Sequence, residues 1–157
     1  MDAPLIEQSL PRAAYLGPRG IRRAPINLGA LLFSGETMQI QLPTLADGEI
    51  YLCGFVDENG DVVHTILLPG DNDDATWQAQ MDWAKSIGGD LPTRAELVIA
   101  YEQHRDLFEK AAYWSNQPDT DPGYSGWAWC QDFNVGHQYH YLQTNELRAR
   151  AVRRLSI

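Results

Sequence analysis

Two short segments rich in side-chain oxygens could bind calcium. Gln117, Pro118 and Asp119 form a triplet that some sugar-binding proteins use to hold Ca²⁺ together with a hexose. Calcium takes about six to eight oxygen ligands, so an Asn-Asp pair and other carboxylates should follow on the next strand. That strand offers Asp132 without a preceding asparagine. We therefore interpret the triplet as a proline turn.

The second segment contains Asp71, Asp73 and Asp74. It resembles the start of a calcium loop, but the glycine and the distal glutamate of such a loop are missing. The acids stand just before Thr76, where a helix is expected to begin, and acids near a helix N-terminus stabilise it by about 0.3–1 kcal/mol. Their expected role is structural.

Zinc is the third chemistry to consider, with His137, His140 and Cys130 as ligands. Residues three apart on a strand point to opposite faces, so the two histidines cannot share an ion without a bulge. We expect no metal and no cofactor.

Nucleophilic catalysis needs a nucleophile, a base and an orienting acid, and no nucleophile-elbow motif occurs in this chain. Cys53 and Cys130 are the two cysteines, and we expect free thiols in a reducing compartment. The sequence predicts a protein that is not an enzyme.

Aromatic residues are the best candidates for binding. Strand alternation sends Trp127 and Trp129 to one side, together with Phe133, and the small residues Ala128 and Cys130 to the other. Exposed Tyr and Trp beside a polar loop are typical anchors for proteins or sugars, although many such rings belong to the core. The predicted ligand-binding residues are Trp114, Asn116, Gln117, Asp119, Tyr124, Trp127, Trp129, Gln138 and His140.

Two helices must position these side chains. The first begins after Thr76 and ends at Gly88-Gly89, with an apolar arc of Trp77, Met81, Trp83, Ala84 and Ile87. Gln80 lies in the middle of that arc and should therefore have a buried partner.

A capping box of Thr93 and Glu96 starts the second helix. Its buried face is predicted to hold Leu97, Tyr101, His104 and Phe108.

Strands are expected on both sides of the helices. Asn59-Gly60 joins residues 49–56 and 61–68 into a hairpin, and a turn at residues 134–136 joins 127–133 to 137–143. Residues 37–42 also alternate, and residues 148–155 are expected to form the last strand. Prolines and glycines at residues 116–126 argue against regular structure there.

Charge is unevenly distributed along this chain of net charge −9. Residues 36–146 are strongly acidic, whereas both ends are basic. The four arginines near the C-terminus, Arg148, Arg150, Arg153 and Arg154, are expected to pair with acids of the middle segment. Binding of nucleic acid through them is a weaker alternative.

Residues 1–35 contain four prolines and no sustained periodicity, which predicts an extended arm. No signal peptide or membrane-spanning run is visible, so synthesis in the cytoplasm is expected. The arm carries apolar residues that should dock on a neighbouring subunit or partner: Leu5, Ile6, Leu10, Tyr15 and Ile21.

Four motifs occur in an order that resembles a known family. They are G-G-x-L-P-T-R-A-E-L ending at Leu97, Tyr113-Trp114-Ser115, the segment 127–136 and the segment 148–154. In this order they resemble the Lcl C-terminal domain family of bacterial and phage proteins. The resemblance covers residues 50–157 and implies an α+β domain of C-type-lectin-like fold, with two helices on small antiparallel sheets.

The resemblance also implies binding without chemistry. We expect an arm at residues 1–35 and a domain at residues 36–157 that binds a protein or glycan, as a virion or tail-associated phage protein. One alternative is a cytoplasmic phage inhibitor of a host protein. Another is an enzyme of the formylglycine-generating type, which would require paired active-site cysteines that Cys53 and Cys130 do not provide.

Overall fold

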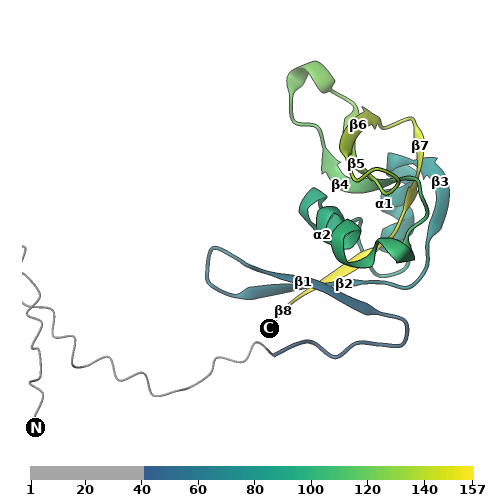
Figure 1. Cartoon of the computed structure of the whole chain (residues 1–157). Helices are drawn as coiled ribbons and strands as arrows, with labels where there is room; N and C mark the ends of the chain where they lie inside the picture. Colours follow the sequence, from purple (N-terminus) through teal and green to yellow (C-terminus); the bar gives the residue numbers. More distant parts are fainter. Residues whose placement is uncertain (1–40) are drawn as a thin grey trace, which may run out of the picture. The chain divides into compact units, whose positions relative to one another are not determined.

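The computed structural model describes residues 41–157 and has an α+β fold (Figure 1). The predicted arm and residues 37–40 of the expected first strand lie outside these residues. A three-stranded sheet has the order β1 (Ile50–Val56), β2 (Val62–Leu67) and β8 (Val152–Ser156). A five-stranded sheet has the order β3 (Asn72–Thr76), β7 (Glu146–Ala149), β4 (Ala112–Pro118), β5 (Trp127–Asp132) and β6 (Gln138–Leu142).

Both predicted helices are present. Helix α1 (Trp77–Ser86) is capped by Thr76, whose hydroxyl accepts a hydrogen bond from the Ala79 amide. Gly88 follows it with φ of 80°. Contrary to the prediction, Ile87 is exposed, because the helix has ended before it can turn this residue inward.

Helix α2 (Arg94–His104) starts at the expected capping box. The Thr93 hydroxyl accepts from the Glu96 amide at 3.2 Å, and the Thr93 amide donates to the Glu96 carboxylate at 2.6 Å. The helix ends before Phe108, and the short 3₁₀ segment η2 (Arg105–Leu107) carries the chain on to this buried ring.

The five-stranded sheet has a helix on each face. Neighbouring residues of a strand point to opposite faces, and Tyr113 and Trp114 of β4 enter different clusters of buried side chains. Tyr113 packs with Leu97 of α2, whereas Trp114 packs with Ala84 of α1. The core therefore lies in two layers, one between the sheet and each helix.

Both predicted hairpins are confirmed, at β1–β2 and β5–β6. Of the strand expected at residues 37–42, the described residues 41 and 42 are irregular. The expectation of no regular structure at residues 116–126 was wrong, because β4 extends through Pro118 and a 3₁₀ turn η3 (Pro122–Tyr124) follows. Pro118 can belong to β4 because the pairing of β4 with β5 is irregular between Trp114 and Pro118. Proline is tolerated in a strand at such irregular positions.

The acids before α1 do not act at its N-terminus: Asp73 and Asp74 belong to strand β3, Asp71 precedes it, and no acid lies in the first helical turn. Asp71 and Asp73 instead form ion pairs with Arg148 of β7, at 2.9 and 3.1 Å. Asp71 also accepts a hydrogen bond from the Tyr113 hydroxyl. Burial and this carboxylate raise the Tyr113 pKa to about 12.

The expected strand at residues 148–155 is divided between the two sheets. Buried Arg150 separates β7 from β8, and its guanidinium donates to the carbonyls of Leu107 and Leu68. The predicted pairing with acids holds for the other three arginines of this segment: Arg148 with Asp71 and Asp73, Arg153 with Glu49, and Arg154 with Glu96 and Asp90.

None of the helices within residues 41–157 is long and apolar enough to cross a membrane.

Candidate functional site

Arg94, the first residue of α2, is held in a fixed position beside the five-stranded sheet. Its guanidinium carbon lies 3.6 Å from the centre of the Trp129 ring, and its Nε donates to the Gln138 side chain at 2.9 Å. The Gln138 amide in turn donates to the Arg94 carbonyl at 2.8 Å. The side chain of Gln117 accepts from the Arg94 backbone amide at 2.7 Å. Strands β4 and β6 thus fix this cation over a tryptophan of β5.

Trp129 belongs to a group of four rings that we call the aromatic face: Tyr124, Trp127, Trp129 and His140. His140 lies opposite Trp129 in the β5–β6 register and stacks on it, with ring centres 4.9 Å apart and planes inclined by 19°. The centres of the Tyr124 and Trp127 rings lie 4.4 and 5.0 Å from that of His140. The imidazole is therefore the centre of the group.

The loop between β4 and β5 is tied to this centre by Asp119. Its carboxylate accepts from His140 Nδ1 and, through its other oxygen, from the Asp121 amide at 2.9 Å. The backbone hydrogen bond from Asp121 and then the one from His140 lower the Asp119 pKa. An ionised carboxylate therefore orients the imidazole and also binds the backbone of Asp121, whose carbonyl accepts from the Tyr124 amide.

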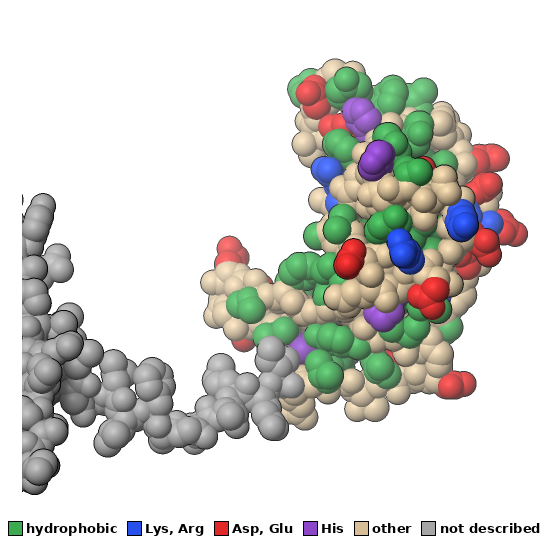
Figure 2. Space-filling model, viewed as in Figure 1, with side chains coloured by type: hydrophobic (Ala, Val, Ile, Leu, Met, Phe, Trp, Pro, Cys, Tyr) green, Lys and Arg blue, Asp and Glu red, His purple; other side chains and the backbone are tan. Residues whose placement is uncertain are grey.

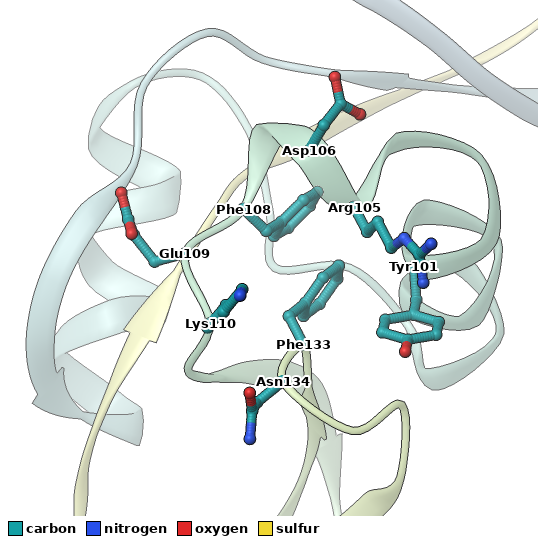
Figure 3. Close-up of a pocket in the computed structure, with 8 residues that line it drawn as sticks. All are labelled: Tyr101, Arg105, Asp106, Phe108, Glu109, Lys110, Phe133 and Asn134. Carbon is teal, nitrogen blue, oxygen red and sulfur yellow. The ribbon is translucent and has the colours of Figure 1, made fainter.

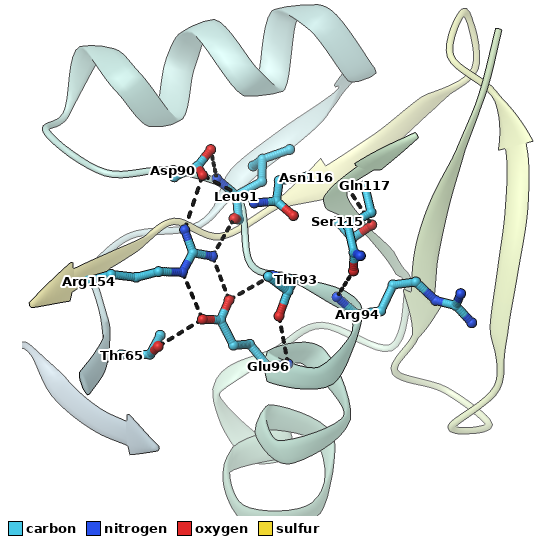
Figure 4. A network of polar contacts seen from close by, with 10 residues as sticks. All are labelled: Thr65, Asp90, Leu91, Thr93, Arg94, Glu96, Ser115, Asn116, Gln117 and Arg154. Atoms are coloured by element: carbon cyan, nitrogen blue, oxygen red, sulfur yellow. Dashed lines mark hydrogen bonds and ion pairs between the residues drawn. The ribbon is translucent and has the colours of Figure 1, made fainter. Parts of the chain in front are cut away.

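A network of charges on the other side of Arg94 fixes the start of α2. Arg154 of β8 donates to both oxygens of Glu96 and to Asp90, while Thr65 donates to Glu96 at 2.7 Å. Figure 4 shows that the Arg94 side chain points away from the Glu96–Arg154 pair, toward the strands of the aromatic face. The network fixes the start of α2 without using the Arg94 guanidinium, which therefore contacts the strands instead.

Most predicted ligand-binding residues are brought together around the aromatic face, including Gln117, Asp119 and Gln138. The prediction that Trp114 binds a ligand was wrong. Its ring is fully buried against α1, and its indole N–H donates to the Ala75 carbonyl. Asn116 instead donates to Asp90 at 3.1 Å. The sequence signal for Trp114 was its aromatic type, which does not distinguish core from surface.

Sequence reasoning did not include Arg94 in the site. Arg94 lies within the segment of the Thr93–Glu96 capping box, which gave it a structural place only, and its stacking on Trp129 depends on a contact between segments distant in the sequence. Among residues 41–157, no group of three or more His, Cys, Asp or Glu side chains has the geometry of a metal site. His137 contacts the Tyr139 hydroxyl and His140 contacts Asp119, so the two histidines have separate partners.

No family model matches the sequence, and no curated protein matches it either. The resemblance to the Lcl family therefore depends on the short ordered motifs themselves.

A pocket lies at the other end of α2. This pocket has a volume of about 720 Å³, and the rings of Phe108 and Phe133 stack in it with centres 3.9 Å apart. Figure 3 shows Arg105 and Lys110 on either side of these rings. Its charged rim is exposed, and none of its lining residues belongs to the aromatic face, so we treat it as a separate feature.

Proposed function

We propose that this protein is a non-catalytic binding module whose ligand contacts the aromatic face. The observation that carries the proposal is the set of four partly exposed rings, arranged around His140 and fixed by Asp119 and Arg94. Rings that are already ordered lose little conformational entropy when a ligand binds. Such a surface suits the apolar face of a sugar ring or an aromatic or aliphatic side chain of a protein.

The partners of His140 favour binding over catalysis. An Asp-His pair is also part of hydrolytic triads, where a hydroxyl or thiol contacts the second nitrogen of the imidazole. Among residues 41–157, the side chain that hydrogen-bonds His140 is Asp119, and aromatic rings surround the imidazole. This environment supports a role of His140 as a contact surface.

For the wider role, we propose a C-type-lectin-like domain related to the Lcl family, carried by a phage virion or tail and docked through the arm at residues 1–35. The observed α+β architecture and the order of the motifs support this proposal. Detection of the protein in purified virions by mass spectrometry is the expected result. Its absence from particles, with recovery in a complex from infected host lysate, would favour the inhibitor alternative.

The binding surface is tested by replacing Trp127 with alanine in the full chain. The matched control is Val98→Ala, because Val98 is half-exposed on α2 and outside the aromatic face. Both variants and the wild type are applied to an immobilised glycan panel and to whole host cells. We expect Trp127→Ala to weaken retention by about tenfold or more, which corresponds to about 1.4 kcal/mol, and Val98→Ala to leave it unchanged. Equal retention of the two variants would contradict the proposal.

A further inference from the structure

Strand β6 forms one edge of the five-stranded sheet and is free of the features that normally protect an edge. The opposite edge, β3, carries Asp73 and Asp74, and the edge strand β8 of the other sheet carries Arg153 and Arg154. Strand β1 has an irregular register. By contrast, no Asp, Glu, Lys, Arg or Pro occurs from residue 133 to residue 145. A second strand can therefore pair here without meeting an Asp, Glu, Lys or Arg side chain of β6 itself.

The outward backbone groups of β6 follow from its pairing with β5. The Asp132 amide donates to the His137 carbonyl, and the Gln143 amide donates to the Gly126 carbonyl. In an antiparallel ladder, hydrogen-bonded pairs alternate with pairs whose backbone groups point away from the partner strand. The register then places the backbone N–H and C=O groups of Gln138, His140 and Leu142 on the free edge. The Leu142 carbonyl also accepts from Asn145, and a carbonyl has two lone pairs.

Three side chains of β6 are partly exposed to solvent. Tyr139 is 39% exposed, Tyr141 37% and Leu142 45%. Figure 2 shows hydrophobic and histidine side chains at the end of the molecule where β5 and β6 lie, while acidic side chains gather beside β3. Within the described residues, the edge strand is therefore unpaired and exposes two tyrosines and a leucine.

We propose that β6 pairs with β6 of a second copy of this chain, in antiparallel orientation about a twofold axis at His140. The sequence Gln138-Tyr139-His140-Tyr141-Leu142 is nearly symmetric about its centre. In this register Tyr139 of each copy faces Tyr141 of the other, and Gln138 faces Leu142. The outward backbone groups of the two copies then meet in three hydrogen-bonded pairs, and the two tyrosine pairs occupy the closer, non-hydrogen-bonded positions.

This dimer brings the aromatic faces of the two copies side by side. A twofold axis perpendicular to the joined sheet keeps His140 of both copies on the same side. The two imidazoles become cross-strand neighbours, so two aromatic faces form one bivalent surface. A bivalent ligand would bind more tightly than a single site allows. The dimer itself depends on β6 alone and stands even if the proposed ligand binding fails.

Two double variants test the register in the full chain. Tyr139→Lys combined with Tyr141→Lys places like charges opposite each other across the twofold axis. Tyr139→Lys combined with Tyr141→Glu places each lysine opposite a glutamate of the other copy. Sedimentation equilibrium of the wild type should give a mass of at least twice 17.7 kDa at tens of micromolar. We expect the lysine-lysine variant to halve that mass and the lysine-glutamate variant to retain it.

Val98→Lys is the control for an added surface charge, and it should leave the mass unchanged. Circular dichroism establishes that each variant is folded. If the lysine-lysine variant fails to fold, amide hydrogen exchange of the wild type replaces it: the His140 amide should become more protected as the protein is concentrated. A monomeric wild type, an unchanged mass in the lysine-lysine variant, or protection independent of concentration would overturn the proposal.

Discussion

At the scale of single residues, Gln80 shows how a polar side chain can be an organising part of the core. It is fully buried in the middle of α1, where the sequence predicted an apolar arc and a hidden partner. Its amide donates to the carbonyls of Asp73 and Leu147, and its oxygen accepts from Asn72. Gln80 thus has hydrogen-bond partners, as predicted, although Asn72 and Leu147 are half-buried and Asp73 is exposed. These bonds connect α1 to strands β3 and β7, which the sequence could not show because the contact with Leu147 spans 67 residues.

Replacement of Gln80 by alanine should be strongly destabilising. The variant loses packing and leaves two carbonyls and the Asn72 amide without their partner, and an unsatisfied buried group costs about 1–3 kcal/mol. We expect the free energy of unfolding, measured in urea, to fall by about 2–4 kcal/mol. Gln78→Ala is the control, because Gln78 is exposed on the same helix and bonds Asp82 at the surface. A loss below 1 kcal/mol for Gln80→Ala would show that this network contributes little.

At the scale of elements, the β5–β6 hairpin determines the geometry of the aromatic face. The sequence predicted this hairpin from the residues around Gly136, and the structure confirms it. Gly136 has φ of 82°, and a Cβ atom placed on it would lie 2.8 Å from the ring of Tyr101. The turn is therefore packed against α2, and both its backbone conformation and this contact require glycine.

Gly136→Ala should destabilise the domain more than an alanine in the first hairpin. Gly60 is the matched control, because its φ of 89° is similar but nothing lies within 4 Å of the added Cβ. Both variants suffer the strain of a positive φ, of about 1 kcal/mol or more, whereas Gly136→Ala must also displace Tyr101. We expect thermal unfolding to begin several degrees lower for Gly136→Ala than for Gly60→Ala. Equal melting temperatures would mean that displacement of the Tyr101 ring does not lower the stability of the domain.

Element patterns were predictable where the signal is local, as in the capping box at Thr93 and the two hairpin turns. They failed where a distant contact overrides them. Residues 148–155 alternate as one strand would, yet Arg150 is drawn inward by the carbonyls of Leu68 and Leu107 and divides the segment between two sheets. The aromatic face could be predicted only in part. Strand alternation places Trp127 and Trp129 together, whereas no local pattern brings Arg94 to them.

At the scale of the whole molecule, one ion pair joins the two sheets through a helix. Arg154 belongs to the three-stranded sheet, and it binds Glu96 at the start of α2, the helix that packs on the five-stranded sheet. Burial opposes ionisation of Glu96, but the hydrogen bonds from Arg154 and the Thr93 amide outweigh it, so the Glu96 pKa is lowered from 4.5. Protonation of this single carboxylate should therefore weaken the contact between the layers.

The pH dependence follows from the direction of this shift. Because the folded-state pKa of Glu96 lies below the unfolded value of 4.5, the unfolded chain binds more protons between the two values. The stabilisation is complete above pH 4.5 and is lost as the pH falls through the folded-state pKa. Glu49 adds to the same trend, since its hydrogen bond with Arg153 lowers its pKa to about 2.

Glu96→Gln should lower the free energy of unfolding by about 3 kcal/mol at pH 7, because it leaves Arg154 partly unpaired. It should also reduce the slope of that free energy between pH 5 and pH 3, measured by urea titration at each pH. Glu102→Gln, an exposed position on the same helix, serves as the control and should match the wild type. If Glu96→Gln keeps the wild-type slope, the acid sensitivity arises from other carboxylates, and the Arg154 pair is not what couples the sheets to pH.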